Sequence, residues 1–152
     1  MMVLILFTIV LIDIGWGVFV KVTLQHAVRE GVRYAITNRV ADDGLGGSLG
    51  QLSSIREVVF RYAGSVLVGQ EEKVTIKFFN PVNLVEDQSP YRNRGGNVVM
   101  VSVENYEYFP IIPIGRNNPW WRLEIGAYTP IVFTVHAADR MESCPMGVCS
   151  PL

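Results

Sequence analysis

The stretch MMVLILFTIVLIDIGWGVFV, residues 1–20, decides the fold, because 16 of its 20 residues are apolar. The exceptions are Thr8, Asp13, Gly15 and Gly17. About 20 such residues in a helix cross the ~30 Å of hydrocarbon in a bilayer. A cleaved signal peptide instead combines a basic start with a small-residue cleavage site, and this stretch shows neither. We therefore predict a retained transmembrane helix over residues 1–20. A signal peptide and a buried helix of a soluble protein are the alternatives.

The next stretch, KVTLQHAVREGVRYAITNRV (residues 21–40), continues the helical pattern without a proline or a turn cluster. Its apolar residues recur at spacings of three and four, which is typical of one buried stripe on an amphipathic helix. We expect one continuous helix to about residue 37, whose second half packs on a sheet through Val28, Val32, Ala35 and Ile36.

The remaining sequence predicts an α+β domain over residues 21–152. Residues 41–54 are rich in Gly, Ser and Asp and indicate a flexible connection. Ser54 and Glu57 have the spacing of a capping box at the start of a second, short helix. Apolar and polar residues then alternate over 73–79 and 97–109, with a slip near Glu104 and Asn105 that indicates a β-bulge. A further strand is expected from about residue 122 to 136, bent at Pro130. Together these segments predict a small antiparallel sheet of three or four strands.

Asp13 is unusual because it lies inside the apolar stretch. A carboxylate there costs about 2.5–3.5 kcal/mol on insertion scales, so it usually has a partner. Gly17 and Lys21 follow at intervals of four on the same helix face, and a small residue lets another helix approach closely. We predict that Asp13, Gly17 and Lys21 form a subunit contact in the membrane. Alternatively, Asp13 is neutral or remains hydrated near the interface.

Composition and motifs argue against several functions. With 152 residues, 18% of them charged, and a net charge of −1, the chain resembles one globular domain and does not favour nucleic acid as a partner. His26 and His136 are the two histidines, too few for a local set of three or four metal ligands. The common catalytic motifs are absent from the sequence. We predict that the protein is not an enzyme and holds no metal or cofactor.

Two cysteines, Cys144 and Cys149, enclose four residues near the C-terminus. This spacing differs from the redox C-x-x-C motif. A small disulfide loop is expected if the domain faces an oxidising compartment. A pair of free thiols is the alternative.

Four segments, in order along the chain, resemble the TadE-like proteins, which are minor pilins or pseudopilins of tight-adherence (Tad) pilus systems. They are Asp13-Ile14-Gly15, HAVREGVRYA (26–35), VSVENYEYFPIIP (101–113) and AADRMES (137–143). The resemblance implies a type IV pilin-like fold, with a long N-terminal helix packed on a small sheet. No prepilin-peptidase site can be assigned, because the sequence starts directly in the apolar stretch.

The resemblance also implies a function and a location. We expect a non-catalytic minor pilin or pseudopilin that assembles a pilus or secretion filament with other pilin subunits and platform proteins, as a homo- or hetero-oligomer. It would cross the inner membrane once and place residues 21–152 on the extracytoplasmic side, with the filament outside the cell as a further location. Lys21, Arg29 and Arg33 favour the opposite orientation by the positive-inside rule. The alternative function is a membrane-tethered binding module that uses loops 81–96 and 110–121.

Overall fold

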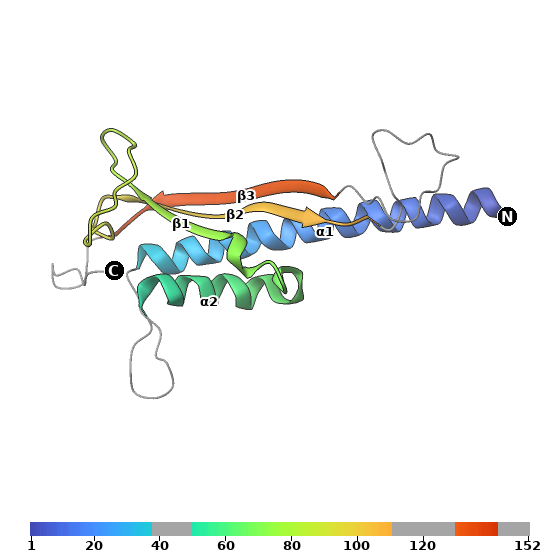
Figure 1. The fold of residues 1–152 in the computed structure, drawn as a ribbon, viewed down its shortest axis with the longest axis horizontal. Coiled ribbons are helices and arrows are strands. Elements are labelled where there is room, and N and C mark those ends of the chain that lie inside the picture. Colours follow the sequence, from blue (N-terminus) through green and yellow to red (C-terminus); the bar gives the residue numbers. More distant parts are fainter. Residues whose placement is uncertain (38–49, 111–129, 143–152) are drawn as a thin grey trace, which may run out of the picture.

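The computed structural model describes residues 1–37, 50–110 and 130–142, and it has the predicted α+β architecture (Figure 1). The helices are α1 (Met2–Ile36) and α2 (Gln51–Ala63), and two short 3-10 helices follow, η1 (Gly64–Leu67) and η2 (Glu71–Lys73). The strands are β1 (Val74–Phe79), β2 (Val98–Tyr108) and β3 (Ile131–Arg140). The described residues thus contain a long N-terminal helix, a second short helix and a small antiparallel sheet.

Helix α1 is continuous over 35 residues, which corresponds to about 52 Å at 1.5 Å per residue. The prediction of one unbroken helix to about residue 37 is confirmed. The helix ends at Thr37, whose hydroxyl donates a hydrogen bond of 2.8 Å to the Tyr34 carbonyl. The apolar first half and the amphipathic second half therefore belong to a single continuous helix.

The predicted capping box of α2 is wrong. The helix begins at Gln51, three residues earlier, with Gly50 at the N-cap position and no side-chain cap. Ser54 lies inside the helix, is fully buried, and donates its hydroxyl to the Gly50 carbonyl at 3.1 Å. Gln51 instead donates to the Ala35 carbonyl at the end of α1, at 3.4 Å. This hydrogen bond satisfies one of the carbonyls at the end of α1, which have no donor within the helix.

The three strands form an antiparallel meander in the order β1-β2-β3. Ile76 pairs with Val101, and Val101 pairs with Ala137 on the other side. Strand β3 differs from the expectation, because it begins at Ile131, directly after Pro130, and continues to Arg140. Pro130 therefore precedes the strand, where its missing N–H costs no ladder hydrogen bond. Residues 122–129 of the predicted strand lie outside the described residues.

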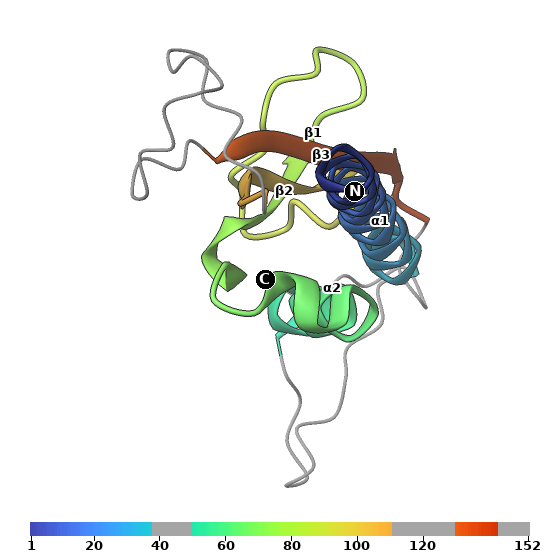
Figure 2. The ribbon, with the colours of Figure 1, turned by 90° about the vertical axis from the view of Figure 1, so that its right-hand side faces the viewer.

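The core lies on both sides of α1, which packs on α2 along one side and on β2 and β3 along the other (Figures 1 and 2). Of the helix residues expected to pack on the sheet, Val28, Val32 and Ala35 are buried, and Ile36 is partly buried against the same core. The buried hydrophobic side chains of α1 follow the three- and four-residue spacing of the sequence, and are Val20, Leu24, Ala27, Val28, Val32 and Ala35.

Gly31 lies where α1 packs against both α2 and β2. A Cβ atom at this position would be 2.5 Å from Cγ2 of Val59 in α2 and 3.6 Å from Cγ1 of Val101 in β2. Real Cβ atoms do not approach as closely as the first of these distances. The absence of a side chain therefore sets the distance between the two helices. Sequence reasoning missed this role, because the apolar pattern of the helix does not mark a glycine on its buried face.

Gly31→Ala should destabilise the fold by about 1–3 kcal/mol, because the added methyl group must displace Val59 in a packed core. Gly15→Ala is the matched control, because a Cβ there meets nothing within 4 Å, and it should stay within about 0.5 kcal/mol of the wild type. Thermal unfolding of the full chain in detergent measures both variants. Equal unfolding temperatures for Gly31→Ala and the wild type would show that the layers are not in contact at this point.

Candidate functional site

The first three turns of α1 have almost no support from the rest of the chain. Among their described side chains, Val3, Leu4 and Phe7 are 83%, 72% and 63% exposed. The helix is long and apolar enough to cross a membrane. An apolar surface of this extent on a soluble monomer is rare and marks contact with lipid or with another protein. The anchor expected from residues 1–20 thus has the surface that an anchor needs.

Asp13 is the first buried residue along the described part of α1. Its side chain is only 5% exposed. The Tyr108 hydroxyl, at the end of β2, donates a hydrogen bond to Oδ1 of Asp13 at 2.5 Å and also lies 3.1 Å from the Asp13 carbonyl oxygen. The partner that we expected on a neighbouring subunit therefore lies in the same chain. The subunit contact itself stays a prediction.

Gly17 and Lys21, the other two residues of that predicted contact, lie on the same side of α1. A Cβ on Gly17 would be 3.4 Å from Cε1 of Tyr108, so the glycine lies against the tyrosine ring of its own chain. Lys21 is exposed and lines the groove that α1 forms with Tyr108 and Phe133. The three residues therefore share one face, and the chain's own sheet covers part of it.

A β-bulge in β2 orients the Tyr108 side chain toward α1. Strand β2 pairs Val103 with Val135 and then Tyr106 with Phe133, so two residues of β2 oppose only Thr134 of β3. Asn105, inside the bulge, has a positive φ of 54°, which asparagine tolerates better than most residues. The predicted bulge is confirmed. It shifts the alternation of the strand by one residue, so that Tyr106 and Tyr108 are buried on the side of Val99, Val101 and Val103.

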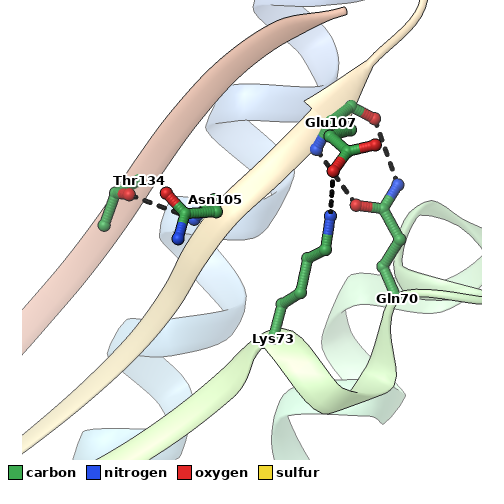
Figure 3. Close-up of polar contacts among 5 residues, drawn as sticks. All are labelled: Gln70, Lys73, Asn105, Glu107 and Thr134. Atoms are coloured by element: carbon green, nitrogen blue, oxygen red, sulfur yellow. Dashed lines mark hydrogen bonds and ion pairs between the residues drawn. The ribbon is translucent and has the colours of Figure 1, made fainter.

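Polar side chains hold the end of β2 beyond the point where β1 stops pairing with it (Figure 3). The first pair of β1 with β2 is Val74 with Val103. Further along, the Gln70 amide donates to the Glu107 carbonyl at 3.1 Å and accepts from the Glu107 N–H at 3.0 Å, as a neighbouring strand would. Lys73 adds an ion pair of 3.1 Å to the Glu107 carboxylate. Sequence reasoning missed Gln70 and Tyr108, because neither belongs to a recognisable motif.

The buried contact changes the acidity of Tyr108. Burial first, and then the hydrogen bond and the charge of Asp13, raise the pKa of the Tyr108 hydroxyl to about 12. The hydroxyl therefore keeps its proton, and its role as donor, throughout the physiological pH range. The Tyr108 hydroxyl is therefore not a group that titrates near neutral pH.

The helix that carries this site resembles a known protein family. Residues 1–33 match the family model described as TadE-like protein. We call these residues the TadE-like segment. The match confirms the resemblance predicted from the sequence, and it includes Asp13, Gly17, Lys21 and Gly31. No curated protein and no solved structure matches the chain.

The TadE-like segment ends before the other two stretches that resemble the family, residues 101–113 and 137–143. Of these, residues 101–108 lie in β2 and residues 137–140 lie in β3. Cys144 and Cys149 are outside the described residues, as is loop 110–121 beyond Pro110. Within the ranges that the structure describes, no group of three His, Cys, Asp or Glu side chains is placed to hold a metal ion.

The pKa of Tyr108 predicts how stability depends on pH. A folded-state pKa of about 12, above the ordinary value of about 10, means that the folded protein holds this proton more tightly than the unfolded chain. The resulting stability is complete below about pH 10 and is lost as the pH rises through 12. Tyrosinate absorbance of the protein in detergent should show a step near 12. Burial also raises the pKa of Tyr106, so the readout is the amplitude of the alkaline step. Tyr108→Phe should lower that amplitude by one tyrosine, and Tyr62→Phe, at an exposed position, should leave it unchanged. An amplitude near pH 12 that Tyr108→Phe does not lower would disprove the buried contact.

Proposed function

We propose that this protein is a minor pilin or pseudopilin that acts in the assembly of a Tad or type IV-like pilus or secretion filament. It acts through helix and domain contacts and performs no catalysis. The match of the TadE-like segment indicates a protein associated with Tad pili. The proposal of a pilin role rests on the unequal burial of α1. This helix is exposed and apolar over its first turns and is central to the core from Val20 to Ala35.

This unequal burial suits a subunit that moves from a membrane into a filament. A helix that is continuous from Met2 to Ile36 transmits the position of its membrane half directly to the domain. Its exposed apolar side chains need lipid while the protein is anchored. In a filament, the same side chains would be buried against helices of neighbouring subunits. Both environments remove apolar surface from water, which is favourable at roughly 25 cal/mol per Å².

The location that we propose is the inner membrane, crossed once, with the domain on the extracytoplasmic side. This orientation rests on the family resemblance and on the disulfide that the sequence predicts between Cys144 and Cys149. The proposed partners are lipid, other pilin subunits and the proteins of the assembly platform. The cations after the apolar stretch, Lys21, Arg29 and Arg33, are the feature that favours the opposite orientation.

We infer that the expected contact with a neighbouring helix lies on the other face of α1. Gly17 faces Tyr108 of its own chain, whereas a Cβ on Gly15 would meet nothing within 4 Å. Leu11, Phe19 and Val22 are each more than half exposed, and with Gly15 they recur at spacings of three and four. A small residue between large ones is typical of close helix packing in membranes. We therefore propose this face, rather than the Asp13 face, for contact with a neighbouring helix.

Gly15→Leu and Gly17→Leu test the proposal as a matched pair. Gly15→Leu should leave the membrane level and thermal unfolding of the protein unchanged but reduce the number of pili, because it blocks a helix approach. Gly17→Leu should lower the unfolding temperature, because leucine collides with the Tyr108 ring. Piliation and protein level are measured in cells that lack the wild-type gene. Normal piliation without the gene, together with purified pili that lack the protein, would overturn the proposed function.

A further inference from the structure

The turn that follows β1 exposes three apolar side chains at its tip. Val82, Leu84 and Val85 are 90%, 69% and 59% exposed. A contiguous group of large apolar residues on a surface turn, where polar residues are the rule, marks a site of interaction. We call residues 82–85 the tip.

Hydrogen bonds fix the conformation of the tip. The Leu84 N–H donates to the Asn80 carbonyl at 2.9 Å, and the Asn80 N–H donates to the Val85 carbonyl at 3.0 Å. The side chains of Asn80 and Asn83 accept from the N–H groups of Val82 and Val85 at 2.9 and 3.1 Å. Leu84 has a positive φ of 53°, which is unfavourable for a leucine. The chain therefore holds apolar side chains outward on an ordered turn, and such pre-organisation lowers the entropy cost of binding.

An apolar groove lies at the other end of the domain. It has a volume of about 450 Å³ and runs between α1 and the ends of β2 and β3. Val10, Ile14 and Val18 line it from the helix, and Tyr108, Ile131 and Phe133 line it from the sheet. Among the described lining residues, Lys21 is the one cation and Asp13 the one anion. Asp13 is buried and Lys21 is exposed, so Lys21 is the charge that a partner can reach.

The tip of a chain cannot occupy the groove of the same chain. The tip follows Phe79, which pairs with Val98 at the start of β2, whereas Tyr108 ends that strand. Ten residues of extended strand separate the two positions by about 33 Å, and Figure 1 shows the turn after β1 and the end of β2 at opposite ends of the sheet. A second copy of the chain can bring a tip to the groove.

The charges beside the two surfaces are complementary. Glu86, directly after the tip, is exposed, and Lys21 lines the groove. We propose that the tip of one copy inserts into the groove of the next copy, with Glu86 facing Lys21. This inference rests on the proposed function, because it describes how copies of the chain contact one another in a filament. The tip and the groove are different surfaces. Such a contact is heterologous, and repetition of it from copy to copy builds an open filament rather than a closed dimer.

Disulfide cross-linking between two differently tagged copies tests the contact directly. In a background with Cys144→Ser and Cys149→Ser, one copy carries Leu84→Cys and the other Val18→Cys. Oxidation of assembled filaments should give a dimer that contains both tags. Tyr62→Cys, exposed on α2, replaces Leu84→Cys as the matched control and should give none. Filaments that contain the protein but yield no tip-to-groove dimer would overturn the inference and leave the proposed function intact.

Charge reversal provides a second test that keeps both native cysteines. Lys21→Glu and Glu86→Lys should each reduce filament assembly, and the double variant should recover it, because the opposite charges are restored. Assembly that is normal in both single variants, or that is not recovered in the double variant, would contradict the contact. If the groove instead holds a lipid chain, the double variant will be as defective as Lys21→Glu alone. Absence of the wild-type protein from filaments would count against the proposed function rather than against the contact alone.

Discussion

The burial of one face of α1 is the constraint on which the rest of the structure depends. The stripe from Val20 to Ala35 is the surface that α2 and the sheet share, and Gly31 allows both to approach it closely. Because the helix is continuous, its first turns must project beyond that core. They cannot fold back to bury their apolar side chains. The projecting segment therefore requires surroundings other than water, which a membrane supplies and which the proposed filament would also supply.

Because Tyr108 contacts Asp13, burial of α1 begins at different residues on its two faces. Asp13 precedes Val20 by seven residues, or about 10 Å along the helix. On the face toward the sheet, the protein covers α1 from Asp13 onward, whereas on the opposite face exposed apolar residues continue to Val22. Tyrosine is common at membrane interfaces because its ring is apolar and its hydroxyl is polar. The end of β2 thus combines an apolar ring with a hydroxyl that satisfies the carboxylate.

The sequence predicted the features that have a periodic or compositional signal. The helix, the alternating strands and the bulge near Asn105 are of this kind, as is the resemblance carried by residues 26–35. Other features depend on contacts between distant residues. Ser54 matched a capping pattern, but tertiary packing buried it inside α2. The partner of Asp13 is 95 positions away, and Gln70 substitutes for a strand without any motif. Such contacts form only when the layers are assembled, so local patterns cannot reveal them.

The central claim is that α1 passes from lipid into a protein core without interruption. Spin-label accessibility along its exposed face tests this claim most directly, in bilayers, with the two cysteines replaced by serine. Single labels at Val3, Phe7, Leu11 and Val22 replace exposed side chains and leave the core intact, and a label at Arg29 serves as the reference in water. We expect the first three labels to collide with oxygen dissolved in lipid, Val22 to lie near the crossover, and Arg29 to collide with a water-soluble nickel complex. Labels at Val3, Phe7 and Leu11 that collide with nickel as often as Arg29 does, or that are shielded from both reagents in the monomer, would contradict the account.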